Sequence, residues 1–410
     1  MKKEEYNSYQ EDLAFAKELN ILRNDFYYQL IDGEKPSLVD FMYNPLDTLS
    51  GDAYTARRID EHRTFYLIVD GMGKGLSASL TAMMMTSFIN HLIDKMLEHD
   101  SFSLDMLVKE SMGFIQPILL DEEALSIDYI FLDTHYKELH YAKFAMPPFL
   151  LEDSDGKIIK LKSNNMPMSK WQKEFNVKKC NVDGVEKFLF YSDGIVENST
   201  KEEGKVYAEF IEDDFRASFT REEFKNKLFE RLDTQEDDLT LIFINTLNLN
   251  ETTLLETKKF ETSLDSVDIA NEWYSDLFHS ISMDLKASYS ANVVFTELFM
   301  NAYEHGNLGI DSITKHQLLE DDVYFDKLLE LEKNVNKEIE VKVYRLVNLT
   351  STYIVTQIID EGEGFDTQIL SQIFRNSQKF NGRGVFVSRK NSMGIYYNCK
   401  GNKVLFLNKI

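Results

Sequence analysis

The pattern of apolar and polar positions divides the chain into regions of different character. From residue 5 to about 30, apolar side chains recur at helical spacing, which predicts an amphipathic helix. The stripe consists of Leu13, Ala16, Leu19, Leu22 and Phe26. It can dock on its own domain, or it can serve as a dimerisation or signalling helix. The pattern leaves both alternatives open.

Beyond residue 40 the pattern becomes rich in short apolar runs bounded by turn residues, which are typical of strands. Strands are predicted at 65–69, 187–191 and 239–244, a hairpin at 126–132 with 139–144, and helices at 76–97, 103–120 and 221–232. Strands dominate and two helices lie between the early ones. The fold class expected for this region is therefore α+β with packed sheets.

A polar stretch at 247–256 interrupts this periodicity, and a domain boundary is expected there. Helices then follow at 266–277 and 287–305, and strands at 339–343 and 353–359. The predicted organisation is an N-terminal segment (1–39), a strand-rich domain (40–248) and an α/β domain (256–410) with a helical insertion at 308–338.

Composition narrows the classes of function. The 410 residues are 43% hydrophobic and 28% charged, with a net charge of −24 that repels phosphate backbones and anionic lipid. We therefore expect no nucleic-acid or membrane partner. Two distant cysteines suggest neither a disulfide framework nor a zinc site. Polar residues interrupt the longest apolar stretch and no signal core is present, which favours a cytoplasmic protein.

Several aspartates stand at the ends of predicted strands beside glycine or another carboxylate. They are Asp52, Asp70, Asp193 and Asp237, with Asp238 as the alternative to Asp237. One such aspartate is usually a turn former, but four in one domain indicate a site for hard cations, which prefer oxygen ligands. Two ions sharing bridging carboxylates can activate a water for attack on phosphorus.

These residues lie in motifs that resemble a known family. The motifs are Ser50-Gly-Asp52, Val69-Asp-Gly-Met-Gly-Lys-Gly75, Asn165-Met-Pro-Met168, Tyr191-Ser-Asp-Gly-Ile195 and Asp237-Asp-Leu-Thr240. Their order and spacing resemble the bacterial metal-dependent protein serine/threonine phosphatases of the sporulation stage II protein E type, relatives of the type 2C phosphatases. The resemblance covers about 40–247 and implies an α/β/β/α sandwich holding two Mn²⁺ or Mg²⁺ ions.

The resemblance also implies individual roles. Asp70 would bridge the metals as the central catalytic residue, assisted by the Gly71 carbonyl. Asp52 would bind a metal directly or through water, and Asp193 and Asp237 would complete the second metal site. Lys74 is a candidate phosphate contact. Met72 departs from the wider type 2C pattern, in which a histidine follows the Asp-Gly pair, so the proton donor stays unassigned.

A second constellation lies in the C-terminal third. Glu297, Asn301 and His305 are four residues apart and therefore share one helix face. Two glycine clusters follow, at 360–365 and 382–387. Amides of a glycine-rich turn entering a helix suit phosphate oxygens, and a fixed aspartate can accept a hydrogen bond from the amine of a base.

Together these segments resemble the three boxes of the GHKL (Bergerat) ATP-binding fold, in the form found in anti-sigma-factor serine kinases. The resemblance covers about 256–410. It implies that Asn301 holds Mg²⁺ against ATP, that Glu297 is the general base, and that Asp360 binds adenine. Gly362 and Gly364 would make room for the nucleotide, Gly382, Arg383 and Gly384 would close over the phosphates, and 366–381 would be the ATP lid. A sensor histidine kinase is disfavoured because His279 lacks the expected flanking residues.

The combined resemblance implies a bifunctional bacterial partner-switching protein. Its phosphatase would act on a phosphorylated anti-sigma-factor antagonist, and its ATP domain would act as a serine kinase or bind a sigma or anti-sigma factor. The alternative is an active phosphatase whose C-terminal domain is a nucleotide-gated binding module. A homodimer through the N-terminal helix is a further expectation.

Overall fold

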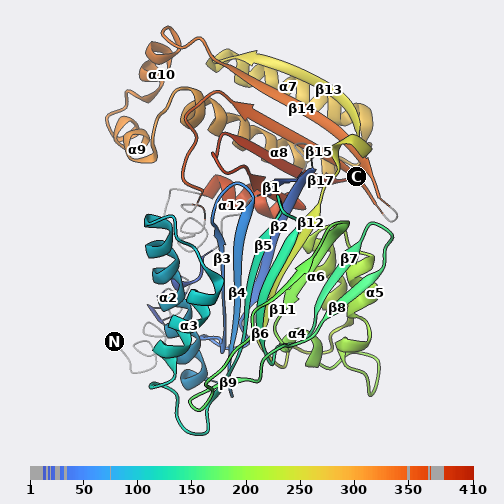
Figure 1. Cartoon of the computed structure of the whole chain (residues 1–410). Helices are drawn as coiled ribbons and strands as arrows, with labels where there is room; N and C mark the ends of the chain where they lie inside the picture. Colours follow the sequence, from blue (N-terminus) through green and yellow to red (C-terminus); the bar gives the residue numbers. More distant parts are fainter. Residues whose placement is uncertain are drawn as a thin grey trace, which may run out of the picture. The chain divides into compact units, whose positions relative to one another are not determined.

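The computed structural model describes residues 13, 14, 17, 18, 20–23, 28–31, 35–73, 75–348, 351–367, 370 and 383–410 (Figure 1). The chain forms two compact units that meet in sequence between Leu247 and Asn248. The N-terminal unit has two sheets and the C-terminal unit has one, and each unit has its own buried core.

The N-terminal unit contains two antiparallel sheets. The first has the order β10-β6-β5-β4-β3, with β9 beside β5, and the second has the order β1-β2-β12-β11-β7-β8. The first comprises β3 (Asp52–Arg58), β4 (Arg63–Gly71), β5 (Ala124–Asp133), β6 (Glu138–Phe144), β9 (Met168–Ser169) and β10 (Lys178–Asn181). The second comprises β1 (Tyr28–Ile31), β2 (Lys35–Asn44), β7 (Phe149–Asp153), β8 (Ile158–Leu161), β11 (Val185–Tyr191) and β12 (Leu239–Thr246).

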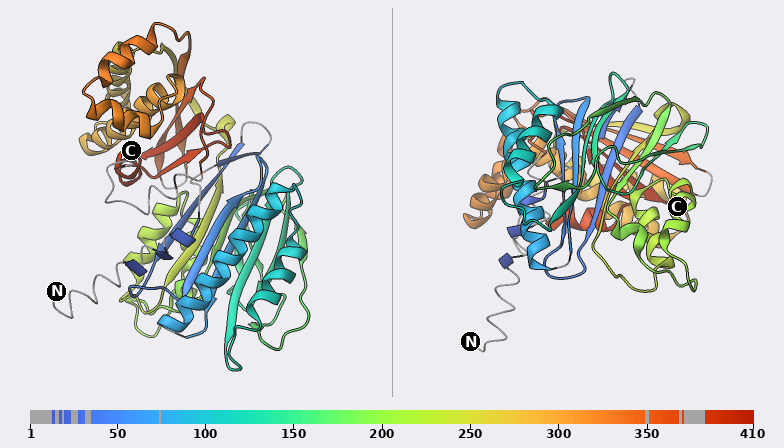
Figure 2. Two further views of the ribbon diagram at one scale, coloured as in Figure 1. Left: turned by 90° about the vertical axis from the view of Figure 1, so that its left-hand side faces the viewer. Right: turned by 60° about the horizontal axis from the view of Figure 1, so that its bottom comes forward.

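Helices cover the outer face of each sheet of this unit (Figures 1 and 2). The first sheet is covered by α2 (Leu76–Glu98) and α3 (Leu104–Ile115), and the second by α4 (Gly194–Glu197), the 3-10 turn η1 (Tyr207–Glu209), α5 (Ile211–Arg216) and α6 (Arg221–Arg231). The layers are therefore helix, sheet, sheet and helix. The run Phe65–Val69 in β4 is fully buried because a helix lies on one side of it and the second sheet on the other. The predicted mixed α/β fold is confirmed.

One helix in the described part of the chain, α2, is long and apolar enough to cross a membrane by length and composition. Its inner face packs on β3 and β4, and 44% of its most apolar window is buried. The core helix of a soluble domain has the same properties. This single helix is therefore weak evidence for a membrane span.

The N-terminal segment differs in part from its prediction. Its described residues from Leu13 to Ile21 are helical, but the helix predicted to continue to about residue 30 is wrong at its end, because Tyr28–Ile31 forms β1. Leu22 is buried in the core, and Arg23 pairs with Thr55 in a parallel bridge, so the chain leaves the helical path there. Ala16, Leu19 and Phe26 lie outside the described residues.

The C-terminal unit is built on one antiparallel sheet of order β13-β14-β15-β17-β16. Its strands are β13 (Thr253–Glu261), β14 (Glu338–Val347), β15 (Thr352–Asp360), β16 (Gly394–Tyr397) and β17 (Lys403–Lys409), preceded by the 3-10 turn η2 (Leu249–Glu251). Helices α7 (Leu264–Ile281), α8 (Leu285–Asn301) and α12 (Arg383–Lys390) pack together against it. The predicted insertion contains α9 (Ser312–Glu320) and α10 (Tyr324–Glu332).

The predicted helix 287–305 is modified at its C-terminal end. The α-helix ends at Asn301, and Ala302–Asn307 continues as a π-helical turn, labelled η3. Turns of π-helix are rare in proteins, and those that occur are often found at functional sites. This turn contains the Glu304-His305-Gly306 part of the second constellation.

Candidate functional site

The aspartates of the first constellation come together where the two sheets of the N-terminal unit meet. Asp52 opens β3 and lies opposite Asp70 in the ladder with β4. Asp193 lies just after β11, and Asp237 lies just before β12. The strands β11 and β12 are antiparallel neighbours. The Ser192 amide donates to the Thr240 carbonyl at 3.0 Å, which closes the end of this second pair.

Close backbone approach at this point requires glycine. A Cβ atom on Gly71 would lie 2.6 Å from the carbonyl oxygen of Ala78, and one on Gly194 would lie 2.0 Å from the carbonyl oxygen of Asp238. Any side chain at these two positions would displace the backbone that carries the aspartates. Gly71 therefore lets the end of β4 pass close to α2, and Gly194 lets the chain after β11 pass close to Asp238.

Burial and mutual repulsion dominate the electrostatics of the cluster. Burial, followed by the charges of Asp52, Asp193 and Asp237, raises the pKa of Asp70 to about 9. Burial also raises the pKa of Asp52 well above its usual range, although Ser192 and Thr240 oppose the shift. The pKa of Asp193 is raised by burial and by Asp237. Such a group of carboxylates favours protons or cations.

The chemistry of the donors fits a hard divalent cation. Asp52 is 3% exposed, and its Oδ2 atom has no hydrogen-bond partner. As the side chains are placed, no three His, Cys, Asp or Glu residues in the described part of the chain already enclose an ion. Ligation would therefore need side-chain adjustment within the cluster. Gly71 lies beside it, in hydrogen-bond contact with the Gly51 carbonyl at 3.0 Å.

The structure separates the two adjacent aspartates before β12. Both carboxylate oxygens of Asp238 are used, because they accept the amides of Leu46 and Gly51 at 2.7 Å each. Asp237 accepts the amide of Asp238 at 2.9 Å, and its charge acts on Asp70 and Asp193. Asp238 thus binds two backbone amides while its charge acts on Asp52, whereas the charge of Asp237 acts on Asp70 and Asp193. Met72 is 62% exposed beside the cluster, and Lys74 lies outside the described residues.

Glu18, Tyr43 and Ser50 contact this site but were missed as site residues in the sequence. Glu18 is fully buried, accepts the Ser50 amide at 3.2 Å, and accepts a hydrogen bond from the Tyr43 hydroxyl. In the sequence Glu18 is one polar position of an amphipathic helix. Only the structure shows that this glutamate is buried and that it contacts Ser50.

In the C-terminal unit, the structure brings Glu297 and Asn301 together on α8. The Asn301 Nδ2 atom donates to Glu297 Oε1 at 3.4 Å. Burial raises the pKa of Glu297, and the nearby cation of Lys315 opposes the shift. His305 turns to the Ile310 carbonyl through Nδ1, so its position on the same predicted face does not make it a partner of Asn301.

The π-helical turn carries a buried carboxylate. Glu304 is 1% exposed, forms an ion pair with Lys315 of α9 and accepts a hydrogen bond from the Tyr324 hydroxyl of α10. These contacts fasten the insertion to the end of α8. They also explain why Lys315 acts on Glu297, about two turns earlier.

Asp360 ends β15 within a tight glycine contact. Its Oδ1 atom accepts the Gly362 amide at 2.8 Å, and a Cβ atom on Gly306 would lie 2.5 Å from its Cγ. Gly364 has φ of 80°, and a Cβ there would lie 1.9 Å from the Lys400 carbonyl oxygen. Burial raises the pKa of Asp360 to about 6. The glycines thus allow the backbone to pass close to Asp360.

The structure brings Asp360 and Glu297 into one region, because the charges of both act on the buried Tyr397 of β16. The third box is described only in part. Arg383 and Gly384 begin α12, whereas Gly382 and most of the predicted lid 366–381 lie outside the described residues.

The family match falls within the N-terminal unit. Residues 60–247 match the family described as Stage II sporulation protein E (SpoIIE). The phosphoserine phosphatase RsbP of Bacillus subtilis is 28% identical over 164 residues, which are 39% of this chain and 40% of RsbP. The chain thus aligns with less than half of that relative. The matched region is thus similar to SpoIIE-type phosphatases, in agreement with the motifs.

Solved structures give weaker matches. The RsbU and RsbW domains of Rv1364c from Mycobacterium tuberculosis are 14% identical, cover 91% of this chain and 92% of their own, and have a TM-score of 0.46. The SiaA-PP2C domain of Pseudomonas aeruginosa is 17% identical, covers 59% and 98%, and has a TM-score of 0.48. Both scores lie below 0.5, so the assignment rests on the family match and RsbP.

Proposed function

We propose that the N-terminal unit is a metal-dependent phosphatase of phosphoserine or phosphothreonine on a protein partner. The convergence of strand-end aspartates from two sheets, with raised pKa values and one unpartnered carboxylate oxygen, carries this proposal. Asp70 is central because the charges of Asp52, Asp193 and Asp237 all act on it. The partner class proposed is an anti-sigma-factor antagonist, in the cytoplasm of a bacterium.

Two Mn²⁺ or Mg²⁺ ions would be held by Asp52, Asp70, the Gly71 carbonyl, Asp193 and Asp237. When bound, such ions supply Lewis acidity toward water and phosphoryl oxygens. The protein's own part is to hold the carboxylates in place. Asp238 does so by fixing Leu46 and Gly51 through their amides, so we assign Asp237 as the ligand and Asp238 as its support.

For the C-terminal unit we propose ATP binding with Mg²⁺ and serine kinase activity. Asn301 would hold Mg²⁺, Asp360 would accept from adenine, and Glu297 would accept the proton of a serine hydroxyl. The raised pKa of Glu297 supports this role, because a general base works best when its pKa approaches the operating pH. Gly362, Gly364, Gly382, Arg383 and Gly384 would surround the nucleotide.

A second candidate for this unit is a nucleotide-gated binding module without turnover. The insertion favours it, since Glu304 ties α9 and α10 to the turn that follows Asn301. In that arrangement a nucleotide at Asn301 could change a docking surface on the insertion. A sigma or anti-sigma factor is the partner class proposed, and a dimer through the N-terminal segment stays a proposal.

Matched variants test the two units separately. Asp70→Ala should abolish Mn²⁺-dependent release of phosphate from a phosphorylated antagonist protein while ATP binding persists. Glu297→Gln should retain binding of a fluorescent ATP analogue and lose phosphate transfer to the same protein. Full phosphate release by Asp70→Ala would refute the metal assignment. ATP binding without transfer by the intact chain would leave the binding module as the function of the C-terminal unit.

A further inference from the structure

Three hydrogen bonds hold the backbone of Ser50 and Gly51, which precede Asp52. The Ser50 amide donates to Glu18 Oε1 at 3.2 Å, and the Gly51 amide donates to Asp238 Oδ2 at 2.7 Å. The Gly51 carbonyl accepts the Gly71 amide at 3.0 Å. Three separate parts of the chain therefore determine where β3 begins.

The contact with Glu18 is the one supplied from outside the sheets. Glu18 belongs to the N-terminal helical segment, is fully buried and also accepts from Tyr43, whose hydroxyl oxygen lies 3.4 Å from the carbonyl oxygen of Asp52. Ser50 transmits the contact, because its Oγ atom accepts the Asp52 amide at 3.0 Å. The Asp52 carboxyl also interacts with Ser192 and Thr240, while its Oδ2 atom has no hydrogen-bond partner, so the backbone at 50–52 sets where this side chain starts.

The segment that carries Glu18 is fastened beside the site. Asn90 of α2 donates to the Ile21 carbonyl at 2.9 Å, and Arg23 forms an ion pair with Asp94 at 3.2 Å. Leu22 is 2% exposed in the core between α2 and the first sheet. These contacts join the segment to the helix that follows the Asp70 loop and to β3.

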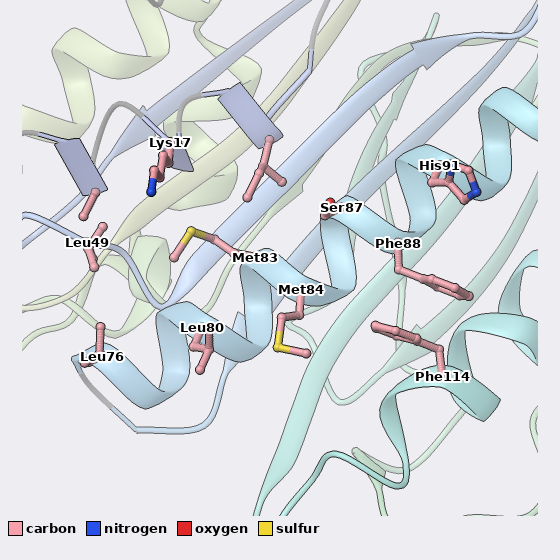
Figure 3. Close-up of a pocket in the computed structure, with 12 residues that line it drawn as sticks. Lys17, Leu49, Leu76, Leu80, Met83, Met84, Ser87, Phe88, His91 and Phe114 are labelled. Atoms are coloured by element: carbon pink, nitrogen blue, oxygen red, sulfur yellow. The ribbon is translucent and has the colours of Figure 1, made fainter.

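A groove lies beside the described residues of the same segment. A groove of about 650 Å³ separates it from the first turns of α2 (Figure 3). Lys17 and Leu49 lie on one side of it, and Leu80, Met83 and Met84 lie on the other. Among the described residues of the segment, Leu22 and the polar contacts with Asn90 and Asp94 hold it against α2.

We propose that Glu18 is a positioning residue for the metal site, which makes docking of the N-terminal segment a condition for placing Asp52. The inference rests on the proposed metal-dependent phosphatase. It names the residue through which an event at the N-terminal segment would reach the metal ligands. Release of the segment would free the Ser50 amide and weaken metal binding at Asp52.

Mn²⁺ binding to the full chain, measured by calorimetry without substrate, tests the proposal directly. Glu18→Ala should weaken Mn²⁺ affinity by about 10- to 100-fold, the range found when a partner that orients a metal ligand is removed. Glu18→Gln keeps an oxygen for Ser50 and Tyr43 and should bind Mn²⁺ almost as the natural chain does. Leu22→Ala, which loosens the docking, should shift affinity in the same direction as Glu18→Ala.

Hydrolysis of p-nitrophenyl phosphate gives a second measurement. Excess Mn²⁺ should restore the maximal rate of Glu18→Ala, because its metal ligands are intact. The matched control is Glu203→Ala, which removes an exposed glutamate and should change neither measurement. Equal Mn²⁺ affinity of Glu18→Ala and the natural chain would overturn the inference alone. Absence of Mn²⁺ binding by the natural chain would instead overturn the proposed phosphatase.

Discussion

The two candidate sites differ in the charges that surround their buried carboxyl groups. Around Asp70, the strongest electrostatic effects come from three other carboxylates, and its pKa rises to about 9. Around Glu297, the strongest electrostatic effect comes from the cation of Lys315, which opposes the effect of burial. The first site concentrates negative charge, which favours the binding of metal ions. In the second site, the cation of Lys315 already offsets part of the negative charge of Glu297.

The difference follows from the elements that build each site. In the N-terminal unit, antiparallel neighbours place strand ends side by side, so aspartates from β3, β4 and the β11–β12 pair share one region. In the C-terminal unit, Glu297 lies on a helix and Glu304 lies on the π-helical turn that follows it. The insertion adds Lys315 beside them. The adjacent strand ends of the first site bring carboxylates together, whereas the helix end of the second site has both carboxylates and a lysine around it.

Removing the central carboxylate should have the largest effect. Asp70→Asn is expected to lower Mn²⁺-dependent hydrolysis of p-nitrophenyl phosphate by roughly a thousandfold, because Lewis-acid assistance contributes several kcal/mol and each 1.36 kcal/mol is tenfold. Binding of a fluorescent ATP analogue serves as the control and should not change. Hydrolysis at the natural rate would show that the acidic cluster is not the catalytic centre.

The pH dependence of stability tests the second site. Since the pKa of Asp360 is raised from 3.8 to about 6, its contribution to stability is complete below pH 4 and is lost as the pH rises through 6. Asp360→Asn should remove this loss, which amounts to up to about 3 kcal/mol. Urea unfolding at pH 4 and pH 8 measures it, with Trp273 as the reporter in a Trp171→Phe background. An unchanged difference between the two pH values would contradict the assignment.

The adjacent aspartates before β12 offer a matched pair. Asp238→Asn should destabilise the N-terminal unit by about 1.5–3 kcal/mol, because one of the two amides loses its acceptor and the other keeps only an uncharged one. Asp237→Asn should instead weaken Mn²⁺ binding with little loss of stability. Urea unfolding followed by Trp171, together with Mn²⁺ calorimetry, separates the two. The reverse result would make Asp238 the ligand.

Replacing Lys315 should give the smallest effect. Lys315→Met removes the cation that lowers the pKa of Glu297, so this carboxyl should titrate at higher pH. Lys315 is 32% exposed, so solvent screens its charge and the pKa of Glu297 should rise only slightly. Carboxyl ¹³C NMR measures the titration without requiring kinase turnover. A shift to lower pH would contradict the proposed electrostatic role.

The sequence alone determined which local elements form and which residue types are available for chemistry. The run Phe65–Val69 became a buried strand because it is uniformly apolar, and Asp70 followed it at the strand end. The motifs that include Asp193 and Asp237 lie in the region that is similar to the SpoIIE family, and short stretches of chain carry them. Local pattern suffices for such features, since propensity and turn chemistry act over a few residues.

Only the tertiary structure decided how those residues are used. Asp237 and Asp238 are equivalent in sequence, and the amides of Leu46 and Gly51 distinguish them from nearly 190 residues away. Glu18 became buried against Ser50 because the predicted helix ends early and Leu22 enters the core. Lys315 reached Glu304 because an insertion folds back on α8. Contacts between distant segments depend on packing, and packing has no local signature in the chain.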